Sequence, residues 1–157
     1  MPSLRTRLFH IYARLRRPMT LGVRGLVENP DGKILLVRHT YIAGWHMPGG
    51  GVERGEPCID SLRREVEEEG GILVNGTPSL VGIFSNHASF PNDHVLLYHI
   101  PSGIWTQGKA TAVAEIAETR WCSPDDLPDG TTNGTRQRLV EFYGKTPLSP
   151  YWTDSKR

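Results

Sequence analysis

The stretch PGGGVERGEPCIDSLRREVEEEGG, residues 48–71, joins a glycine loop to an acidic segment. Consecutive glycines at 49–51 come first, and a run rich in glutamate comes last. Residues 57–69 carry a helical pattern, with Pro57 near its start, where proline is tolerated because its missing N–H has no partner inside the helix. Gly70 and Gly71 close the pattern, as residues that adopt left-handed conformations do at helix C-termini. The stretch therefore predicts a helix directly behind a flexible loop.

The predicted helix has one acidic flank and one apolar flank. At about 100° per residue, Glu65, Glu68 and Glu69 fall on one side, and the side chains that would dock on a sheet are Ile59, Leu62 and Val66. Carboxylates this close repel one another, and a divalent cation among them would remove the repulsion. Glutamate oxygens beside an open loop suit hard cations such as Mg²⁺ or Mn²⁺. The alternative interpretation is an acidic face that is merely solvated.

The same stretch resembles the Nudix hydrolase signature, G-x5-E-x7-R-E-U-x-E-E-x-G-U, where U is a bulky aliphatic residue. Every specified position is filled without an insertion, by Gly50, Glu56, Arg64, Glu65, Val66, Glu68, Glu69, Gly71 and Ile72. A complete match of this kind is far more specific than a lone glycine-rich loop. The resemblance extends more loosely over about residues 19–128, and leaves the N-terminal segment and the C-terminal tail outside it.

This resemblance implies an α/β (mixed α+β) Nudix fold, with a mixed β-sheet between helices. It implies hydrolysis of a nucleoside diphosphate linked to a moiety X. The implied catalytic and metal-binding residues are Glu65, Glu68 and Glu69, with a main-chain carbonyl at Gly50, and Glu65 is also a candidate base. The implied cofactor is Mg²⁺, with Mn²⁺ as a substitute. The structural members of the motif would be Gly50, Glu56, Arg64 and Gly71. Bound cations offset diphosphate charge and activate water, so no covalent nucleophile is needed.

Candidates outside the motif carry weaker signals. Family members often use a further carboxylate from a later loop as a metal ligand, and Glu115 lies at the expected offset, with Glu118 as the alternative. The substrate-binding candidates for phosphate or sugar are Arg24 and Arg38, with His39. The candidates for a base are the aromatic residues Trp45 and Phe90, with Tyr41. Each has a competing interpretation, since basic residues at strand ends are often only solvated and aromatic residues often belong to the core.

Composition restricts the class of protein. A chain of 157 residues predicts a single domain over 1–157. A net charge of +1 gives no reason to expect binding to long nucleic acid. No apolar run approaches the roughly 20 residues of a transmembrane helix, so we expect no membrane partner. We expect a cytoplasmic enzyme with a small-molecule nucleotide substrate, and a homodimer is an open alternative to a monomer.

The two ends of the chain have their own character. No acid precedes Glu28, whereas residues 4–16 alternate arginines with apolar residues at helical spacing, which predicts a basic amphipathic helix within 1–17, stopped by Pro18. We favour a helix that packs on the domain with a solvated basic face. A transit peptide and a membrane-surface helix are the alternatives. The tail, 145–157, has no regular period and is expected to be irregular.

The remaining pattern supplies the strands and the competing functions. Residues 19–28 and 33–39 flank the turn NPDG and predict a β-hairpin. Residues 79–85 and 93–100 predict two further strands, and residues 133–144 a helix that ends at Gly144. A non-catalytic nucleotide-binding module on the same fold is the main alternative to the pyrophosphohydrolase. Isomerisation of an isoprenoid diphosphate is a third function, and no cysteine is clearly placed to serve as its acid.

Overall fold

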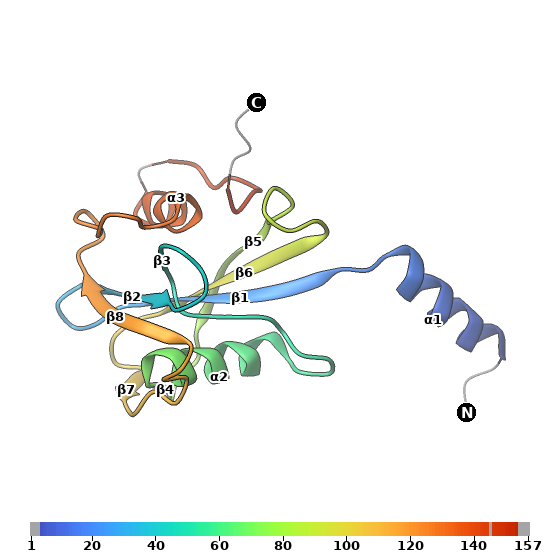
Figure 1. Cartoon of the computed structure of the whole chain (residues 1–157), viewed down its shortest axis with the longest axis horizontal. Helices are drawn as coiled ribbons and strands as arrows, with labels where there is room; N and C mark the ends of the chain where they lie inside the picture. Colours follow the sequence, from blue (N-terminus) through green and yellow to red (C-terminus); the bar gives the residue numbers. More distant parts are fainter. Residues whose placement is uncertain (1–3, 145, 154–157) are drawn as a thin grey trace.

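The computed structural model describes residues 4–144 and 146–153 and arranges them as a mixed α+β fold (Figure 1). The helices are α1 (Leu4–Arg16), α2 (Cys58–Gly70) and α3 (Asn133–Phe142). The strands are β1 (Thr20–Val27), β2 (Ile34–His39), β3 (Trp45–His46), β4 (Ile72–Val74), β5 (Ser79–Ser85), β6 (Asp93–Ile100), β7 (Trp105–Gln107) and β8 (Ile116–Cys122). Helices α2 and α3 lie on opposite sides of the strands, which confirms the predicted mixed sheet between helices.

The strands divide into small sheets. One has the order β1-β6-β5, with β1 parallel to β6 and β5 antiparallel to it. A second has the order β3-β2-β8, all antiparallel, and β4 pairs with β7 in a third. The central strand β6 is buried along much of its length, because both of its edges are paired and both faces are covered.

The predicted β-hairpin of residues 19–28 and 33–39 is wrong, although both strands and the turn exist. The side chain of Asn29 accepts the N–H groups of Asp31 and Lys33, and a single bridge joins Glu28 to Ile34. The pairing ends there because both edges of β1 are occupied. One edge pairs with β6 over the full strand, and the other pairs with the glycine loop of residues 48–52. The loop that the sequence analysis singled out thus takes the place of β2.

Two apolar clusters separate the layers, as expected from the alternation of side chains along a strand. The cluster beneath α2 includes Val23 and Val27 of β1, Leu35 of β2, and Leu62 and Val66 of α2 itself. The cluster beneath α3 takes the alternate residues, Leu26, Ile34, Leu36, Leu97 and Leu139 among them. Helix α2 is therefore fixed to β1 and β2 through one flank, and its acidic flank is left for the loop.

The two ends of the chain differ in how they meet this layered body. Helix α1 forms over residues 4–16, as predicted, but it has no buried residue and projects away from the strands (Figure 1). The expectation that it packs on the domain is therefore wrong. Residues 146–153 return across α3 and bridge to β5 at Ser85↔Tyr151, while residues 145 and 154–157 of the predicted tail lie outside the described part. In the described residues, no helix is both long and apolar enough to span a bilayer.

Candidate active site

Helix α2 begins and ends within one residue of the predicted bounds, and it lies unusually close to β1. Pro57 is its N-cap, and Gly71 takes the left-handed conformation, with φ of 67°, at its C-cap. A Cβ on Gly25 of β1 would lie only 2.9 Å from Cγ1 of Val66. Contact this close, together with the complete burial of Leu62 and Val66, fixes the rotation of the helix. The glutamates are therefore held at a defined angle to the loop.

The loop of residues 47–52 is held from beneath by Arg24. One guanidinium nitrogen, Nη1, donates to the carbonyl oxygens of Met47 and Gly49 at 2.9 Å each. Burial lowers the pKa of Arg24, while the carboxylates of Glu69 and Glu65 act in the opposite direction. Gly49 has φ of 146°, and a Cβ there would lie 2.0 Å from the carbonyl oxygen of Val23. Only glycine fits at position 49.

Glu65 lies directly against the loop. A Cβ on Gly50 would stand 2.6 Å from its carboxyl carbon and from both of its oxygens. Its Oε1 accepts from Nη1 of Arg64 at 2.7 Å. Burial raises the pKa of the Glu65 carboxyl, and the ion pair with Arg64 partly opposes that rise. A carboxylate with a raised pKa is a better proton acceptor.

Arg64 ties Glu56 to the helix and also approaches Glu68. Its Nε and Nη2 donate to the two oxygens of Glu56 at 3.0 and 3.1 Å, a fork-on-carboxylate contact that lowers the pKa of Glu56 to about 2. The Nη1 that binds Glu65 is also 3.5 Å from Oε2 of Glu68. One cationic nitrogen therefore lies within reach of both Glu65 and Glu68, and the side chain of Glu68 remains 42% exposed.

Glu69 is turned into the protein instead. Its Oε1 accepts from Nε2 of His39 on β2 at 2.7 Å, and its Oε2 accepts from the main-chain N–H of Gly49 at 2.9 Å. The side chains of His39 and Glu69 are 3% and 7% exposed. This contact joins strand β2, helix α2 and the glycine loop. The sequence suggested only a phosphate or sugar contact for His39, because its pairing with Glu69 depends on register between distant elements.

The carboxylates of α2 supply oxygen donors of the kind that a divalent cation needs. Among residues 4–144 and 146–153, no group of three or more His, Cys, Asp or Glu side chains is ready to hold a metal ion. Glu65 and Glu68 nevertheless share one cationic neighbour, since Nη1 of Arg64 lies 2.7 Å from one carboxylate and 3.5 Å from the other. Each oxygen of Glu69 accepts one hydrogen bond and retains another lone pair. Hard carboxylate oxygens beside a main-chain carbonyl fit Mg²⁺.

The further carboxylate candidates differ in their surroundings. Glu118 is bound by Arg120 and Arg38 at 2.8 and 3.0 Å, which lowers its pKa and occupies it. Glu115 is exposed, and its charge raises the pKa of Tyr41, as do the charges of Glu69 and Glu65, after the larger effect of burial. The segment just before Glu115 is attached to α2, because the N–H groups of Thr111 and Ala112 donate to the carbonyl of Glu68 at 2.9 Å, so Glu115 is the better placed of the two carboxylates with respect to α2.

The substrate-binding candidates separate into two groups. Arg24 and Phe90 line a cleft of about 250 Å³ together with Gly50 and Gly51. Trp45 is 5% exposed, belongs to the core, and has the guanidinium groups of Arg120 and Arg38 over its ring at 4.9 and 5.7 Å. Trp45 therefore serves packing, and Arg38 is engaged with it and with Glu118. Asn86 and Trp152 also line the cleft, and no sequence signal pointed to them, because neither lies near the motif.

Comparisons with known proteins agree with this geometry. A family model described as the NUDIX domain matches residues 18–143. A MutT-like protein of Streptomyces ambofaciens is 30% identical over 125 residues, covering 79% of this chain and 71% of that protein. An ADP-ribose pyrophosphatase of Methanocaldococcus jannaschii is 35% identical over 86 residues, covering 53% and 50%. The solved structure of a MutT NUDIX hydrolase from Burkholderia pseudomallei matches with a TM-score of 0.64 at 25% identity, covering 76% of this chain and 95% of that one.

Proposed function

The chain belongs to the Nudix hydrolase family, whose members cleave phosphoanhydride bonds of small nucleotides, and from this premise we propose a Mg²⁺-dependent nucleoside diphosphate-X pyrophosphohydrolase. Water adds to a phosphorus of the diphosphate and the bridging P–O bond breaks, which gives two phosphate products. The relative named as an ADP-ribose pyrophosphatase has a substrate of this class. The identity of X is open to a substrate screen.

One observation carries the proposal. Nη1 of Arg64 is shared by Glu65 at 2.7 Å and Glu68 at 3.5 Å, and Nη2 of the same guanidinium donates to the loop carbonyl of Gly51 at 3.4 Å. This is the environment that two carboxylates of one helix create for a cation. We propose Glu65, Glu68 and Glu69 as the ligands on α2, with the carbonyl of Gly50 and the carboxylate of Glu115 as further donors. When bound, the divalent ion offsets substrate charge and lowers the pKa of water.

The protein side chains have separate proposed parts. Glu65 accepts the proton from the attacking water, since burial raises its pKa above that of an ordinary glutamate. Arg24 holds the loop carbonyls of Met47 and Gly49 in place and presents positive charge to the cleft. Glu69 fixes the loop through Gly49 and is itself oriented by His39. Glu56 holds Arg64, so the carboxylates of the helix keep their spacing.

A matched pair of variants on one helix tests the function. Glu68→Gln removes a proposed ligand, and Glu67→Gln removes the charge of its exposed neighbour, which is about 100° away around the helix. Product release from nucleoside triphosphates, ADP-ribose, nucleotide sugars and dinucleoside polyphosphates is measured by mass, with Mg²⁺ and with Mn²⁺. We expect Glu68→Gln to reduce kcat by at least about 100-fold and Glu67→Gln to act as wild type. Equal turnover by the two variants would exclude this metal site.

Three further expectations remain part of the proposal. The chain 1–157 is expected to fold as a single domain in the cytoplasm. The protein is proposed to be a monomer or a homodimer, and light scattering distinguishes the two. A wild-type protein that binds nucleotides with Mg²⁺ but releases no product would instead support the non-catalytic module.

A further inference from the structure

The C-terminal segment 146–153 lies outside the residues that match the family, 18–143, yet it reaches the candidate active site. Trp152 lines the same cleft as Arg24, Gly50 and Phe90. The polar side chains of Asn86 and Asp93 also line this cleft, and Asp93 accepts from Asn86 at 2.8 Å. Aromatic faces beside an amide and a carboxylate suit a planar base that carries hydrogen-bonding groups.

The segment is attached to β5 by main-chain hydrogen bonds. The N–H of Ser85 donates to the carbonyl of Pro150 at 2.8 Å, and the N–H of Trp152 donates to the carbonyl of Ser85 at 2.8 Å. The indole of Trp152 meets the ring of Phe84 edge to face at 5.9 Å. A Cβ on Gly134 of α3 would stand 2.4 Å from the indole Nε1. The indole is therefore packed between Phe84 of β5 and Gly134 of α3, which fixes its position.

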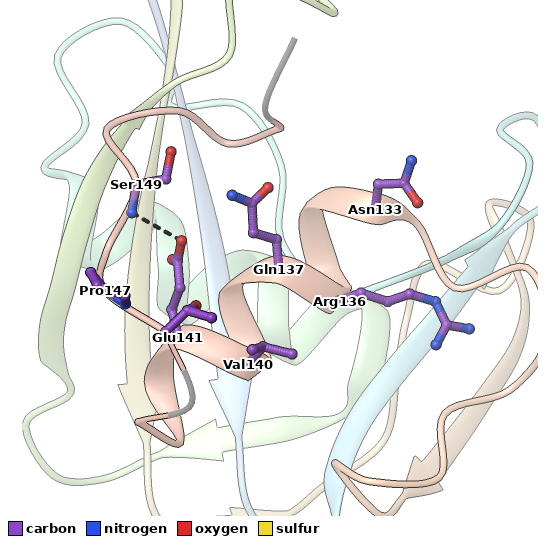
Figure 2. A pocket seen from close by; sticks show the side chains of 8 residues that line it. Asn133, Arg136, Gln137, Val140, Glu141, Pro147 and Ser149 are labelled. Atoms are coloured by element: carbon purple, nitrogen blue, oxygen red, sulfur yellow. Dashed lines mark hydrogen bonds between the residues drawn. The ribbon is translucent and has the colours of Figure 1, made fainter. Parts of the chain in front are cut away.

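A buried ion pair of α3 holds the segment. Arg138 and Glu141 lie 2.7 Å apart with side chains 0% and 1% exposed. Glu141 also accepts from the main-chain N–H of Ser149 at 2.9 Å, the contact drawn in Figure 2, and Arg138 donates to the carbonyl of Tyr151. Buried pairs are costly unless other hydrogen bonds satisfy them. Here some of those hydrogen bonds come from the main chain of the segment itself, so the ion pair and the segment stabilise each other.

The contacts that attach the segment to α3 and β5 are concentrated near residues 149–152. Earlier in the segment, Thr146 and Pro147 line a cavity of about 470 Å³. The side of this cavity formed by α3 includes Asn133, Arg136 and Val140 (Figure 2). The segment therefore crosses α3 as a strap that is fastened beside β5. Its fastened end is the part that carries Trp152 to the cleft.

We propose that this strap forms one wall of the substrate cleft and that Trp152 is a specificity residue that contacts the base of the nucleotide. The inference rests on the proposed function, because it concerns the same cleft. It assigns base recognition partly to a segment that the family match does not include. Replacing an aromatic residue that stacks on a base costs about 1–3 kcal/mol, which corresponds to a loss of affinity of roughly 5-fold to 150-fold.

Binding measurements separate this inference from turnover. Equilibrium dialysis of full-length protein with ADP and with inorganic pyrophosphate, both with Mg²⁺, needs no hydrolysis. We expect Trp152→Ala to weaken ADP binding about 10-fold and to leave pyrophosphate binding unchanged. Trp152→Phe should restore most of the ADP affinity. Gly134→Ala, which displaces the indole, should weaken ADP binding as well. Leu148→Ala, an exposed change in the same strap, is the control and should have no effect.

Two outcomes would overturn the inference. Wild-type ADP affinity in Trp152→Ala would show that the indole does not meet the base. Equal losses of ADP and pyrophosphate affinity would assign Trp152 a merely structural part. If the proteins bind ADP in this pattern but wild type turns over no substrate, the contact between Trp152 and the base is supported and the proposed hydrolysis is contradicted. In an active enzyme, Trp152→Ala should raise KM for nucleotides while kcat changes little.

A second inference comes from α1, which the active site does not use. Its apolar side chains are 55–77% exposed, namely Leu4, Leu8, Phe9, Ile11, Tyr12 and Leu15. At about 100° per residue, Leu4, Leu8, Ile11 and Leu15 form one stripe. Arg7 and Arg14 border this stripe on one side, and Arg5 and Arg16 border it on the other. No acidic residue occurs before Glu28.

We infer that α1 lies on an anionic lipid surface, with its apolar stripe in the headgroup region and its arginines at the phosphates. Helices of this composition lie in the membrane plane, and long basic side chains beside the stripe extend toward the polar layer. The expectation of no membrane partner rested on the absence of a spanning segment, which does not bear on a helix that lies on the surface. The projection of α1 away from the strands leaves its stripe open to such contact.

Vesicle flotation of the full-length protein tests this inference. We expect binding to phosphatidylglycerol–phosphatidylcholine vesicles, and little binding to pure phosphatidylcholine or in 1 M NaCl. Each arginine near an anionic surface contributes about 1 kcal/mol, so Arg7→Glu with Arg14→Glu should reduce binding by more than roughly 10-fold. Leu8→Glu should abolish it. Lys33→Glu with Lys109→Glu makes the same charge change on exposed residues elsewhere and should retain binding.

Other occupants of the stripe give different results. An absence of flotation on anionic vesicles would overturn the inference. Self-association without lipid that Leu8→Glu abolishes, seen as a concentration-dependent mass in light scattering, would assign the stripe to a second copy of the chain.

Discussion

His39 and Glu69 join strand β2 to helix α2 through a buried contact of 2.7 Å, from Nε2 to Oε1. Arg38, the preceding residue on β2, makes the opposite kind of pair, an exposed one with Glu118 at 3.0 Å. Removing one partner of a buried hydrogen bond leaves the other polar group unsatisfied, whereas exposed ion pairs contribute little. Adjacent residues of one strand thus allow a direct comparison.

We predict that His39→Ala lowers the free energy of unfolding by about 3 kcal/mol, because Glu69 keeps only the N–H of Gly49 as a partner. Arg38→Gln should cost less than about 1 kcal/mol. Urea unfolding at neutral pH measures both. The same loss in both variants would mean that the buried contact adds nothing beyond an exposed one.

Gly50 and Gly51 provide a second matched comparison. A Cβ at Gly50 would lie 2.6 Å from the carboxylate of Glu65, whereas a Cβ at Gly51 would meet nothing within 4 Å. We predict that Gly50→Ala displaces Glu65 and lowers kcat/KM by about 100-fold, since small misplacements of catalytic groups have effects of that size. Gly51→Ala should keep at least half of the wild-type value. Steady-state kinetics with Mg²⁺ on the preferred nucleotide decides between these outcomes, and an active Gly50→Ala variant would show that the contact is not needed.

Local signals made α2 predictable. Its helical period, Pro57 and Gly71 are all within the motif, and its bounds differ from the expected 57–69 by only a residue at each end. The burial of Leu62 and Val66 follows from the same period. Strands 79–85 and 93–100 were also predicted with the bounds of β5 and β6, because each is centred on β-branched and other apolar residues.

Pairings between distant segments were not predictable. The glycine loop occupies the edge of β1 that the hairpin would have used, and no local pattern shows that preference. The short strands β4 and β7 exist only as a pair, so neither carries a period of its own. Trp45 illustrates the limit for the site, since an aromatic residue beside the motif has the same sequence signal whether it lies in the core or the cleft. His39 and Trp152 reach the site only through tertiary structure.

Acid should weaken the link between Glu56 and Arg64. Hydrogen bonds from Arg64 lower the pKa of Glu56 from 4.5 to about 2. A carboxyl whose pKa is lower in the folded state than in the unfolded state stabilises the fold at any pH above its unfolded pKa. This contribution is lost as the pH falls through the folded-state pKa. We predict that the melting temperature of wild type exceeds that of Glu56→Gln by a constant margin above pH 4.5. The margin should shrink as the pH falls from 4.5 toward 2.

Glu53→Gln, in the same exposed loop, is the control for the general effect of losing one negative charge. Its melting temperature should follow that of wild type through the acid range. A margin between wild type and Glu56→Gln that persists at pH 2 would contradict a contribution from this ionised carboxylate.

Metal binding should raise the melting temperature, which can be measured independently of turnover. A ligand that binds only the folded state adds about 2.7 kcal/mol at 100 times its Kd. In the present arrangement Arg64 is the nearest cation to Glu65 and Glu68, and Mg²⁺ would add a second. We predict that Mg²⁺ raises the melting temperature of wild type and of Glu67→Gln, and that EDTA reverses the rise. Glu65→Gln and Glu68→Gln should show little rise, with NaCl adjusted to constant ionic strength throughout. A rise of equal size in all four proteins would place the ion elsewhere than on these carboxylates of α2.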